Sequence, residues 1–477
     1  MLPPPPRPTR REFIQLSLLA AAGVALPRLG RAAPSSTPLS RTPKVVDRPP
    51  RIALIGTSGR AQNTIRDFLQ LDVEIAALCD VDATRLARGV ELASPKFPDA
   101  HRYADYRELI EKEPDLDGVV VTTPDHMHAP ISLLAMSRGL HVFCEKPLTR
   151  TVAEARWMRD FARQAGVVTQ MGTQSSASES LRRGIELIQA GVLGQVREVH
   201  IWTDRSSRLP KEPPRHEPPP GLAWDTWLGV AAEREFNSYY HPFRWRWWQD
   251  FGCGPLGDMG CHLTNLSFRA LDLAAPSEID VVLSDPVAPG LFPASARLDY
   301  RFPARGLLAP LTLSWYEGGR TPDPALLESL GIPAQFGSKI PSNNKLIVGD
   351  RGILYGDTYI KLHGEPRFNG ILKHEACTAV PVTLPRNREQ GTSGHYNEWV
   401  QACRGRGTTF TGFDLAAAQT EMVLLGTVAL KLGRRIRWDA ATMSVPGEPS
   451  AAALLRPTYR SGFTVAAREL PALPAQS

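Results

Sequence analysis

Residues 51–61 read RIALIGTSGRA, a β-branched apolar run that leads into a glycine-rich turn. The residues that follow carry apolar side chains on one helical face. Strand, glycine turn and helix in this order favour a dinucleotide site, in which backbone N–H groups at a helix N-terminus face a pyrophosphate. Gly56 fits the first glycine of the fingerprint, Ser58 replaces the second, and Gly59 offers another point of close backbone approach. The predicted cofactor-binding residues of this turn are Gly56, Thr57, Ser58, Gly59 and Arg60.

An acidic residue follows the next predicted strand, which covers residues 73–79. Asp80 lies 24 residues after Gly56, close to the spacing of about 20 at which a carboxylate binds the adenosine ribose. Such a carboxylate repels a 2′-phosphate, so NAD is predicted in preference to NADP. The alternative is that Asp80 only caps the helix that follows it.

A third predicted strand, over residues 117–121, ends in a polar loop that holds Thr123, Pro124, His126 and His128. This loop is expected beside the glycine turn, at the same edge of a sheet. The two alternating histidines suit a metal ion, but no third or fourth ligand is spaced to join them. No metal is therefore predicted.

A fourth predicted strand, over residues 140–144, delivers Glu145, Lys146 and Pro147. A lysine between a carboxylate and a rigid proline thus stands at the carboxyl end of a strand, where open α/β sheets bind their ligands. Strand and helix patterns continue to alternate, which predicts a doubly wound parallel sheet, a Rossmann domain, over residues 50–172.

The second half of the chain has a different pattern. Short runs of alternating polarity without long helices between them predict a large, mostly antiparallel sheet in an α+β domain over residues 173–440. A proline-rich segment at 210–220 is predicted to be a surface loop, because no core strand tolerates it. The alternating runs cover residues 196–202, 279–283, 296–302 and 311–315.

A second informative stretch ends in Asp258 and His262, which share one face if a helix begins near Asp258. An acid beside an imidazole is the usual pairing for proton transfer, whereas the plain alternative is a helix cap and a core histidine. The preceding residues are rich in aromatic side chains that could stack on a sugar, although a tryptophan cluster is more often core. The predicted substrate-binding residues are His241, Arg244, Trp247, Trp248 and Asp258.

These motifs occur in the order glycine turn, Cys79-Asp80, Thr123-Pro124-Asp125-His126, Glu145-Lys146-Pro147, and a Gly-x-Leu-x-Asp-x-Gly-x-His signature that ends at His262. The ordered set resembles the Gfo/Idh/MocA oxidoreductases over residues 51–439. The resemblance implies an active site of Lys146, Asp258 and His262 and a nicotinamide side lined by Thr123, Pro124, Glu145 and Gly172. His128 and Lys146 are also predicted to bind the cofactor, and helices within 391–435 are expected to pack back across the two domains. The resemblance also implies a sugar-like substrate and a homodimer or homotetramer.

The N-terminus carries Arg10-Arg11 before a short apolar run, and a plausible cleavage site lies near residue 32. This is the pattern of a twin-arginine (Tat) export signal, and the run is too short to span a bilayer stably. The expected location is therefore periplasmic or otherwise exported, with the Tat machinery as partner and residues 33–49 as a linker. Residues 441–477 are expected to be a C-terminal tail.

The net charge of +6 falls to +2 without residues 1–32, which gives no electrostatic case for nucleic-acid binding. The predicted function is hydride transfer between NAD and a hydroxyl of a sugar, cyclitol or sugar derivative. A first alternative is an NAD-dependent glycosidase that recycles its bound cofactor, as some relatives do. A second is a non-catalytic sugar-binding protein, for which Ser58 in the glycine turn is the support.

Overall fold

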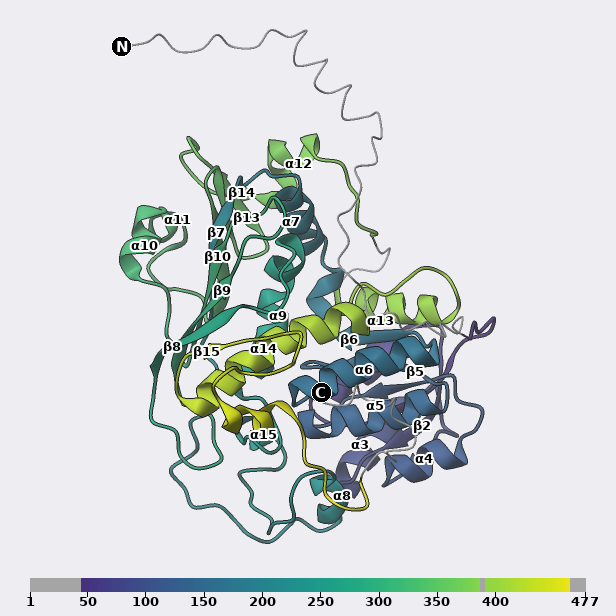
Figure 1. Ribbon diagram of the computed structural model, residues 1–477. Coiled ribbons are helices and arrows are strands. Elements are labelled where there is room, and N and C mark those ends of the chain that lie inside the picture. The colour runs from purple at the N-terminus through teal and green to yellow at the C-terminus, as the bar shows by residue number, and fades with distance from the viewer. Residues whose placement is uncertain (1–43, 387–390, 464–477) are drawn as a thin grey trace, which may run out of the picture. The chain divides into compact units, whose positions relative to one another are not determined.

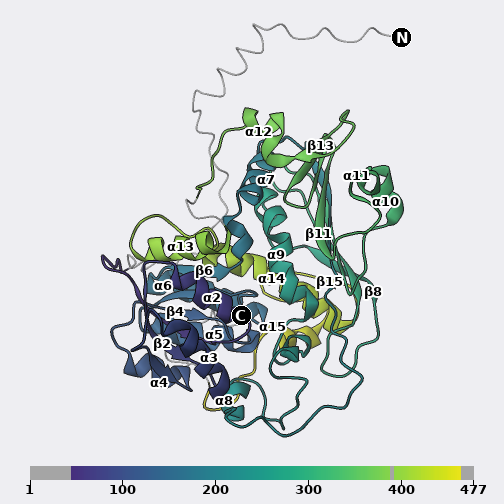
Figure 2. The ribbon, with the colours of Figure 1, turned by 180° about the vertical axis from the view of Figure 1, so that it is seen from behind.

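The computed structural model describes residues 44–386 and 391–463 (Figures 1 and 2). The predicted signal at 1–32 lies outside the described residues. The first sheet has six parallel strands in the order β3-β2-β1-β4-β5-β6, which confirms the predicted Rossmann domain. Because the strand order reverses between β1 and β4, a ligand crevice is expected outside their carboxyl ends. The strands are β1 (Arg51–Ile55), β2 (Glu74–Cys79), β3 (His101–Tyr103), β4 (Gly118–Val121), β5 (His141–Glu145) and β6 (Thr169–Gly172).

Helices cover both faces of this sheet, as Figures 1 and 2 show from opposite sides. One face packs against α4 (Tyr106–Lys112), α5 (His128–Ser137) and α6 (Val152–Ala165). The other face packs against α2 (Arg60–Leu69), α3 (Ala83–Ala93) and, from far along the chain, α13 (Gly391–Cys403). A complete capping box between Thr151 and Glu154 fixes the start of α6 directly after the lysine loop.

The second sheet has nine strands in the order β14-β13-β12-β11-β7-β10-β9-β8-β15. Its pairs are antiparallel except β10 with β7, which is parallel, so the mostly antiparallel prediction is confirmed. The strands are β7 (Val196–Thr203), β8 (Glu278–Ser284), β9 (Ala296–Phe302), β10 (Leu311–Glu317), β11 (Asn343–Gly349), β12 (Gly352–Tyr355), β13 (Tyr359–Leu362), β14 (Asn369–Gly370) and β15 (Ile436–Arg437).

Three helices fill the space between the two sheets (Figure 1): α7 (Glu179–Gln189), α9 (Gly254–Ala270) and α14 (Phe413–Leu432). Within the described residues, α14 alone is long and apolar enough to cross a membrane by length and composition, but 78% of its most apolar 18-residue stretch is buried in the protein. It packs against α6 of the first domain and α9 of the second. We therefore describe it as a core helix that joins the two domains.

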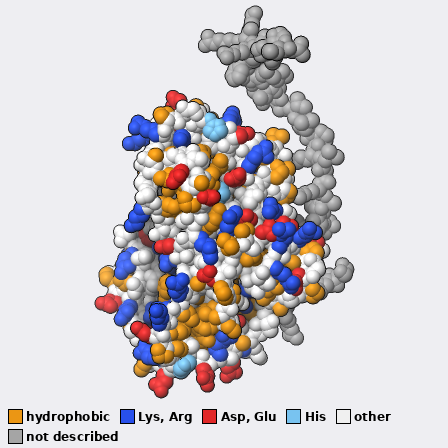
Figure 3. Space-filling view, turned by 90° about the vertical axis from the view of Figure 1, so that its left-hand side faces the viewer, with side chains coloured by type: hydrophobic (Ala, Val, Ile, Leu, Met, Phe, Trp, Pro, Cys, Tyr) orange, Lys and Arg blue, Asp and Glu red, His pale blue; other side chains and the backbone are white. Residues whose placement is uncertain are grey.

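The outer face of the second sheet is polar in part. An ion pair joins Arg297 to Asp299 within β9 at 3.2 Å, and another joins Arg301 of β9 to Asp280 of β8 at 3.1 Å. The short helices α10 (Pro324–Ser329) and α11 (Ile332–Phe336) cover an aromatic cluster near β11 and β12. Figure 3, which views the molecule from this side, shows charged side chains of both signs between small hydrophobic areas.

Two predicted boundaries need correction. Residues 44–49 are not a free linker: Val46 is buried and donates to the carbonyl of Cys403 at 3.1 Å, and Arg48 pairs with Asp117 at 2.6 Å. The C-terminal segment up to 463 is not a loose tail, because the Tyr459 hydroxyl donates to Glu154 at 2.6 Å. Isolated apolar residues such as Leu455 anchor it, and they give no periodic signal in an Ala/Pro-rich stretch. This segment includes η5 (Pro449–Ala451) and α15 (Ala452–Leu455).

Candidate active site

The glycine turn has the backbone geometry that a dinucleotide requires. Gly56 and Gly59 have φ angles of 89° and 62°, which other residues adopt only at a cost. A Cβ on Gly56 would lie 2.7 Å from the carbonyl oxygen of Thr122. No side chain caps the N-terminus of α2 at Gly59. Ala61 N and Gln62 N donate to the carbonyl oxygens of Ser58 and Gly59, whereas the N–H groups of Ser58, Gly59 and Arg60 have no hydrogen-bond partner among the described residues and could bind an anion.

Ser58 keeps its hydroxyl engaged at the position that the fingerprint usually gives to glycine. Arg85 of α3 donates a short hydrogen bond to Ser58 Oγ, and its Nε pairs with Asp82 at 3.1 Å. The serine therefore has a defined partner in the turn and gives no sign of a degenerate site. Arg85 also lines the cavity but was not predicted from the sequence. The local signal for it is its position three residues after Asp82, which caps α3.

Asp80 supports the glycine turn directly. One carboxylate oxygen accepts from Thr57 N at 2.9 Å and Thr57 Oγ1 at 3.0 Å, and the other accepts from Asp82 N at 3.0 Å. Burial raises the pKa of Asp80. The cap of α3 is Asp82, whose side chain accepts from Thr84 and Arg85, so the capping alternative for Asp80 does not apply.

His126 and His128, which follow β4, connect separate backbone segments through contacts of their ring nitrogens with carbonyl oxygens. The ring nitrogens of His128 contact the carbonyl oxygens of Pro147, at 2.8 Å, and Thr123, at 2.9 Å. His128 thereby ties the Thr123–Pro124 loop to the lysine loop. His126 Nε2 contacts the carbonyl oxygen of Trp227 at 3.1 Å. Residues 44–386 and 391–463 contain no cluster of three or more potential metal ligands.

Lys146 and Asp258 form a buried ion pair. Lys146 Nζ donates to the Asp258 backbone oxygen at 2.6 Å and to its Oδ1 at 2.9 Å. Arg246 Nε lies 3.4 Å and Arg205 Nε 3.6 Å from the same carboxylate. Burial alone would raise the pKa of Asp258, but Lys146 and Arg246 hold it well below its usual range.

His262 lines the same cavity as Lys146 and Asp258. Helix α9 begins at Gly254, four residues before the predicted start, and still places Asp258 and His262 on one face. Asp258 bonds Lys146, however, and no hydrogen bond joins it to His262 in the described structure, so the acid–imidazole pairing expected for these two residues is not formed. Burial and then the charge of Lys146 lower the pKa of His262 to about 3, which keeps the ring neutral.

Glu145 belongs to a polar network beneath the lysine. Gln174 Nε2 donates to Glu145 Oε1 at 2.7 Å, and Arg60 Nε lies 3.6 Å from the same oxygen. The Tyr396 hydroxyl of α13 contacts Arg60 at 2.9 Å and Glu145 at 3.5 Å. A Cβ on Gly172 would lie 2.5 Å from Glu145 Oε2, so only glycine fits there. Tyr396 gave no signal in the sequence because it lies about 250 residues away from Glu145 in the chain.

The predicted substrate-binding residues divide into two groups. His241 lines the cavity 3.5 Å from Asp82, and burial lowers its pKa to about 4. Arg244, Trp247 and Trp248 do not line the cavity in the described structure: Arg244 is exposed, Trp247 is buried, and Trp248 packs against an aromatic cluster. The short 3-10 helix η3 (Arg244–Trp247) instead turns Trp245 and Arg246 toward the cavity.

The glycine turn, Asp80, Lys146, Asp258 and His262 border one cavity of about 480 Å³. It extends from the glycine turn and Asp80 to Lys146, Asp258 and His262. The volume is in the usual range for ligand sites. The first domain thus supplies a dinucleotide cradle, and α9 and η3 supply the facing wall.

Residues 50–173 match the sequence profile of the Gfo/Idh/MocA family, described as "Oxidoreductase family, NAD-binding Rossmann fold". Residues 50–173 are therefore similar to the NAD-binding Rossmann domain of this family. Similar curated proteins include a glycosyl hydrolase family 109 protein of Shewanella pealeana, 28% identical over 39% of this chain and 44% of the relative. Another is D-glucoside 3-dehydrogenase of Escherichia coli K12, 28% identical over 49% of this chain and 57% of the relative. The chain thus spans about half the length of these two relatives.

Solved structures of the same fold extend the likeness to both domains. The WlbA dehydrogenase of Chromobacterium violaceum, in complex with NADH and UDP-GlcNAcA, superposes with a TM-score of 0.60 and 17% identity over 84% of this chain and 99% of that one. Aldose-aldose oxidoreductase of Caulobacter crescentus gives a TM-score of 0.57 and 19% identity over 82% and 100%. At these identities the likeness shows the fold.

Proposed function

We propose that this protein is an exported, NAD-dependent oxidoreductase that transfers a hydride to or from a hydroxyl-bearing carbon of a sugar, cyclitol or sugar derivative. One observation carries the proposal: Lys146, Asp258 and His262 face the same cavity as the glycine turn and Asp80. The likeness of residues 50–173 to an oxidoreductase family supports it.

The cofactor cradle fits NAD on the structure's own geometry. The N–H groups of Ser58, Gly59 and Arg60, which have no partner among the described residues, suit a pyrophosphate, and Asp80 suits a diol rather than a 2′-phosphate. When bound, NAD would supply the hydride acceptor or donor. The residues that would hold it are Gly56, Thr57, Ser58, Gly59, Arg60, Asp80, Thr123, Pro124, His128, Glu145 and Lys146, and all of them line the cavity.

Lys146 and His262 would have different roles at the substrate hydroxyl: Lys146 stabilises charge, and His262 transfers the proton. The Lys146 ammonium would stabilise the negative charge that develops on the hydroxyl oxygen during oxidation. Asp258 fixes the ammonium through two contacts, at 2.6 and 2.9 Å. Neutral His262 makes no hydrogen bond within the described residues and would accept the hydroxyl proton, then return it in the reverse direction.

Three measurements test this proposal. Purified protein should release a dinucleotide on denaturation, and it should form NADH when it is supplied with NAD and a suitable sugar. Lys146→Ala and His262→Ala should each lower kcat by at least about 100-fold while NAD stays bound. Turnover that persists in both variants, with NAD bound, would contradict the assigned roles.

A glycosidase reaction is the second candidate, because several similar proteins carry the name glycosyl hydrolase family 109. The same lysine and histidine would then support a transient oxidation that allows elimination of the glycosidic group. An aryl glycoside separates the two candidates. Release of the phenol without net NADH formation would favour the glycosidase.

Export is proposed from the N-terminal sequence. It rests on Arg10-Arg11 and the apolar run after them, with the Tat machinery as the partner. Cell fractionation of the full-length chain against Arg10→Lys/Arg11→Lys tests it, and an unchanged location would contradict it. A homodimer or homotetramer is likewise proposed and is tested by light scattering.

A further inference from the structure

Positive groups outnumber carboxylates at the substrate end of the cavity. Lys146, Arg205 and Arg246 surround a single carboxylate, Asp258, at 2.9, 3.6 and 3.4 Å. Asp125 is the other acid in this part of the cavity, and burial raises its pKa to about 7. It therefore carries at most part of a charge near neutral pH, and the three cations are not neutralised by the protein.

The remaining titratable groups nearby do not remove this excess. Glu145 lies 3.6 Å from Arg60 and is matched by it. Burial keeps the pKa of His262 near 3, so this ring is neutral. Asp80 and Asp82 lie at the ribose end, where Asp82 pairs with Arg85 at 3.1 Å.

Arg246 is held in place before any ligand arrives. Its guanidinium lies over the rings of Trp245 and Phe243, with distances of 4.1 and 4.5 Å to the ring centroids. Nη1 also donates to the carbonyl oxygen of Phe243 at 3.2 Å. A guanidinium fixed in this way loses little conformational entropy when it binds a ligand.

Arg205 approaches from the other side, on the segment that follows β7. Its side chain is 46% exposed, and its guanidinium makes no hydrogen bond within the described residues. Its nearest partner is Asp258, at 3.6 Å. The planar fork of N–H donors is therefore available, and it suits the two oxygens of a carboxylate or phosphate.

We propose that the substrate is an anionic sugar whose carboxylate or phosphate group is held between Arg205 and Arg246, while a hydroxyl of the same sugar lies at Lys146 and His262. The inference rests on the proposed function and adds the substrate class to it. The two arginines would neutralise the ligand charge, and the ligand would complete the charge balance of the cavity.

The test compares sugars that differ in charge, with the NAD-loaded full-length protein. Isothermal titration calorimetry is carried out with glucuronate against glucose, galacturonate against galactose, and glucose 6-phosphate. The acids should bind at least about tenfold more tightly than their neutral partners, as expected for hydrogen bonds to charged groups. A tighter complex with glucose 6-phosphate than with the uronates would identify phosphate as the bound oxyanion.

Three variants test whether Arg205 and Arg246 cause the preference for acidic sugars. Arg205→Gln and Arg246→Gln should each remove most of the preference for acids. Arg208→Gln removes the same charge from an exposed site outside the cavity lining and should keep the preference. Because Arg205 is half-exposed, its substitution leaves the fold intact and keeps the test valid if Arg246→Gln fails to fold.

Equal binding of acids and neutral sugars, including no binding of either, would overturn the inference. A preference for acids that survives both substitutions would overturn it as well. If acidic sugars bind but no sugar gives NADH, the proposed function is wrong while the inference on the bound anion stands. Oxidation of neutral sugars alone would instead leave the proposed function standing and remove the inference.

Discussion

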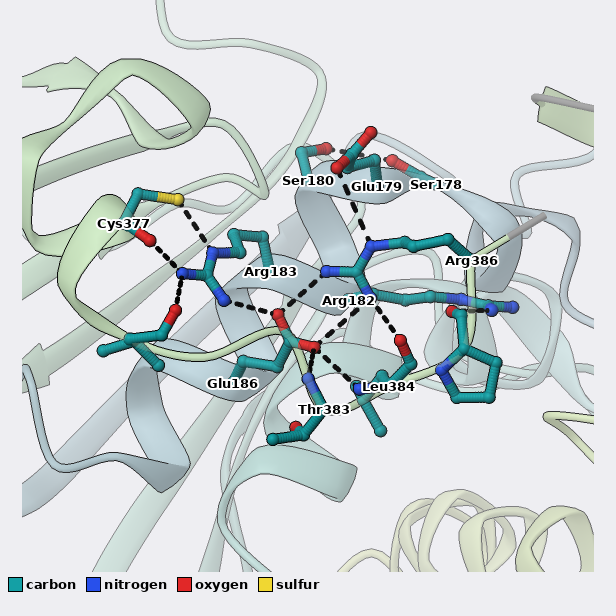
Figure 4. A network of polar contacts seen from close by, with 12 residues as sticks. Ser178, Glu179, Ser180, Arg182, Arg183, Glu186, Cys377, Thr383, Leu384 and Arg386 are labelled. Carbon is teal, nitrogen blue, oxygen red and sulfur yellow. Dashed lines mark hydrogen bonds and ion pairs between the residues drawn. The ribbon is translucent and has the colours of Figure 1, made fainter. Parts of the chain in front are cut away.

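Glu186, a buried carboxylate on α7, provides the sharpest test of the packing (Figure 4). It accepts from Arg183 at 2.7 Å, from Arg386 at 2.8 Å, and from the backbone N–H groups of Thr383 and Leu384 at 2.8 Å each. These contacts lower the pKa of Glu186 to about 2, although burial alone would raise it. Glu186→Gln keeps the size of the side chain but removes the charge that both guanidinium groups face.

The expected loss of unfolding free energy follows from the pKa shift. A carboxyl whose pKa falls from 4.5 to about 2 on folding contributes about 3 kcal/mol at neutral pH. This stability is fully present above the unfolded pKa and is lost as pH falls toward the folded pKa. Glu186→Gln should therefore lower the free energy of unfolding by about 3 kcal/mol at pH 7. At pH 3 the difference in unfolding free energy between wild type and variant should be smaller by about 2 kcal/mol.

Urea unfolding followed by tryptophan fluorescence at pH 7, 5 and 3 measures both quantities. Glu179→Gln is the matched control, because Glu179 also faces Arg386, at 3.7 Å, but its side chain is 46% exposed. A pair of that kind is worth at most about 1 kcal/mol. The reasoning is refuted if Glu186→Gln costs no more than Glu179→Gln, or if its cost is the same at pH 7 and pH 3.

Three further predictions concern the site itself. Gly56→Ala should weaken NAD binding at least about tenfold, measured by fluorescence titration, whereas Gly364→Ala, also at positive φ but with open space around it, should not. Burial raises the pKa of Asp125 to about 7, so the wild type should lose up to about 4 kcal/mol of stability relative to Asp125→Asn between pH 4 and pH 8; parallel pH curves would count against this. Tyr396→Phe removes the hydroxyl between Arg60 and Glu145 and should cost about 1–3 kcal/mol in urea unfolding, and a variant as stable as the wild type would exclude that role.

Much of the cofactor half could be predicted from the sequence because the carboxyl ends of parallel strands share one edge of a sheet. Gly56, Asp80, Thr123 and Lys146 each follow a predicted strand, and the structure brings all four to one cavity. Asp258 and His262 could be predicted together because a helix repeats every 3.6 residues.

The facing wall of the cavity could not be predicted in the same way. The stretch before α9 folds as a short 3-10 helix, which has no periodicity that the sequence reveals over four residues. The expectation for Arg244, Trp247 and Trp248 therefore missed by one or two positions, and Trp245 and Arg246 line the cavity instead. Arg205 follows a strand of the second sheet. Its distance from Lys146 depends on how the two domains pack, which the sequence pattern does not specify.

The packing of α13 has a consequence for synthesis of the chain. Tyr396, Trp399 and Val400 complete the same hydrophobic cluster as Phe68 and Phe143 of the first domain. Those partners leave the ribosome long after the six strands of the first sheet. A nascent chain that ends before α13 would hold its aromatic surface open to water, so the nucleotide-binding half matures only after α13 has been synthesised.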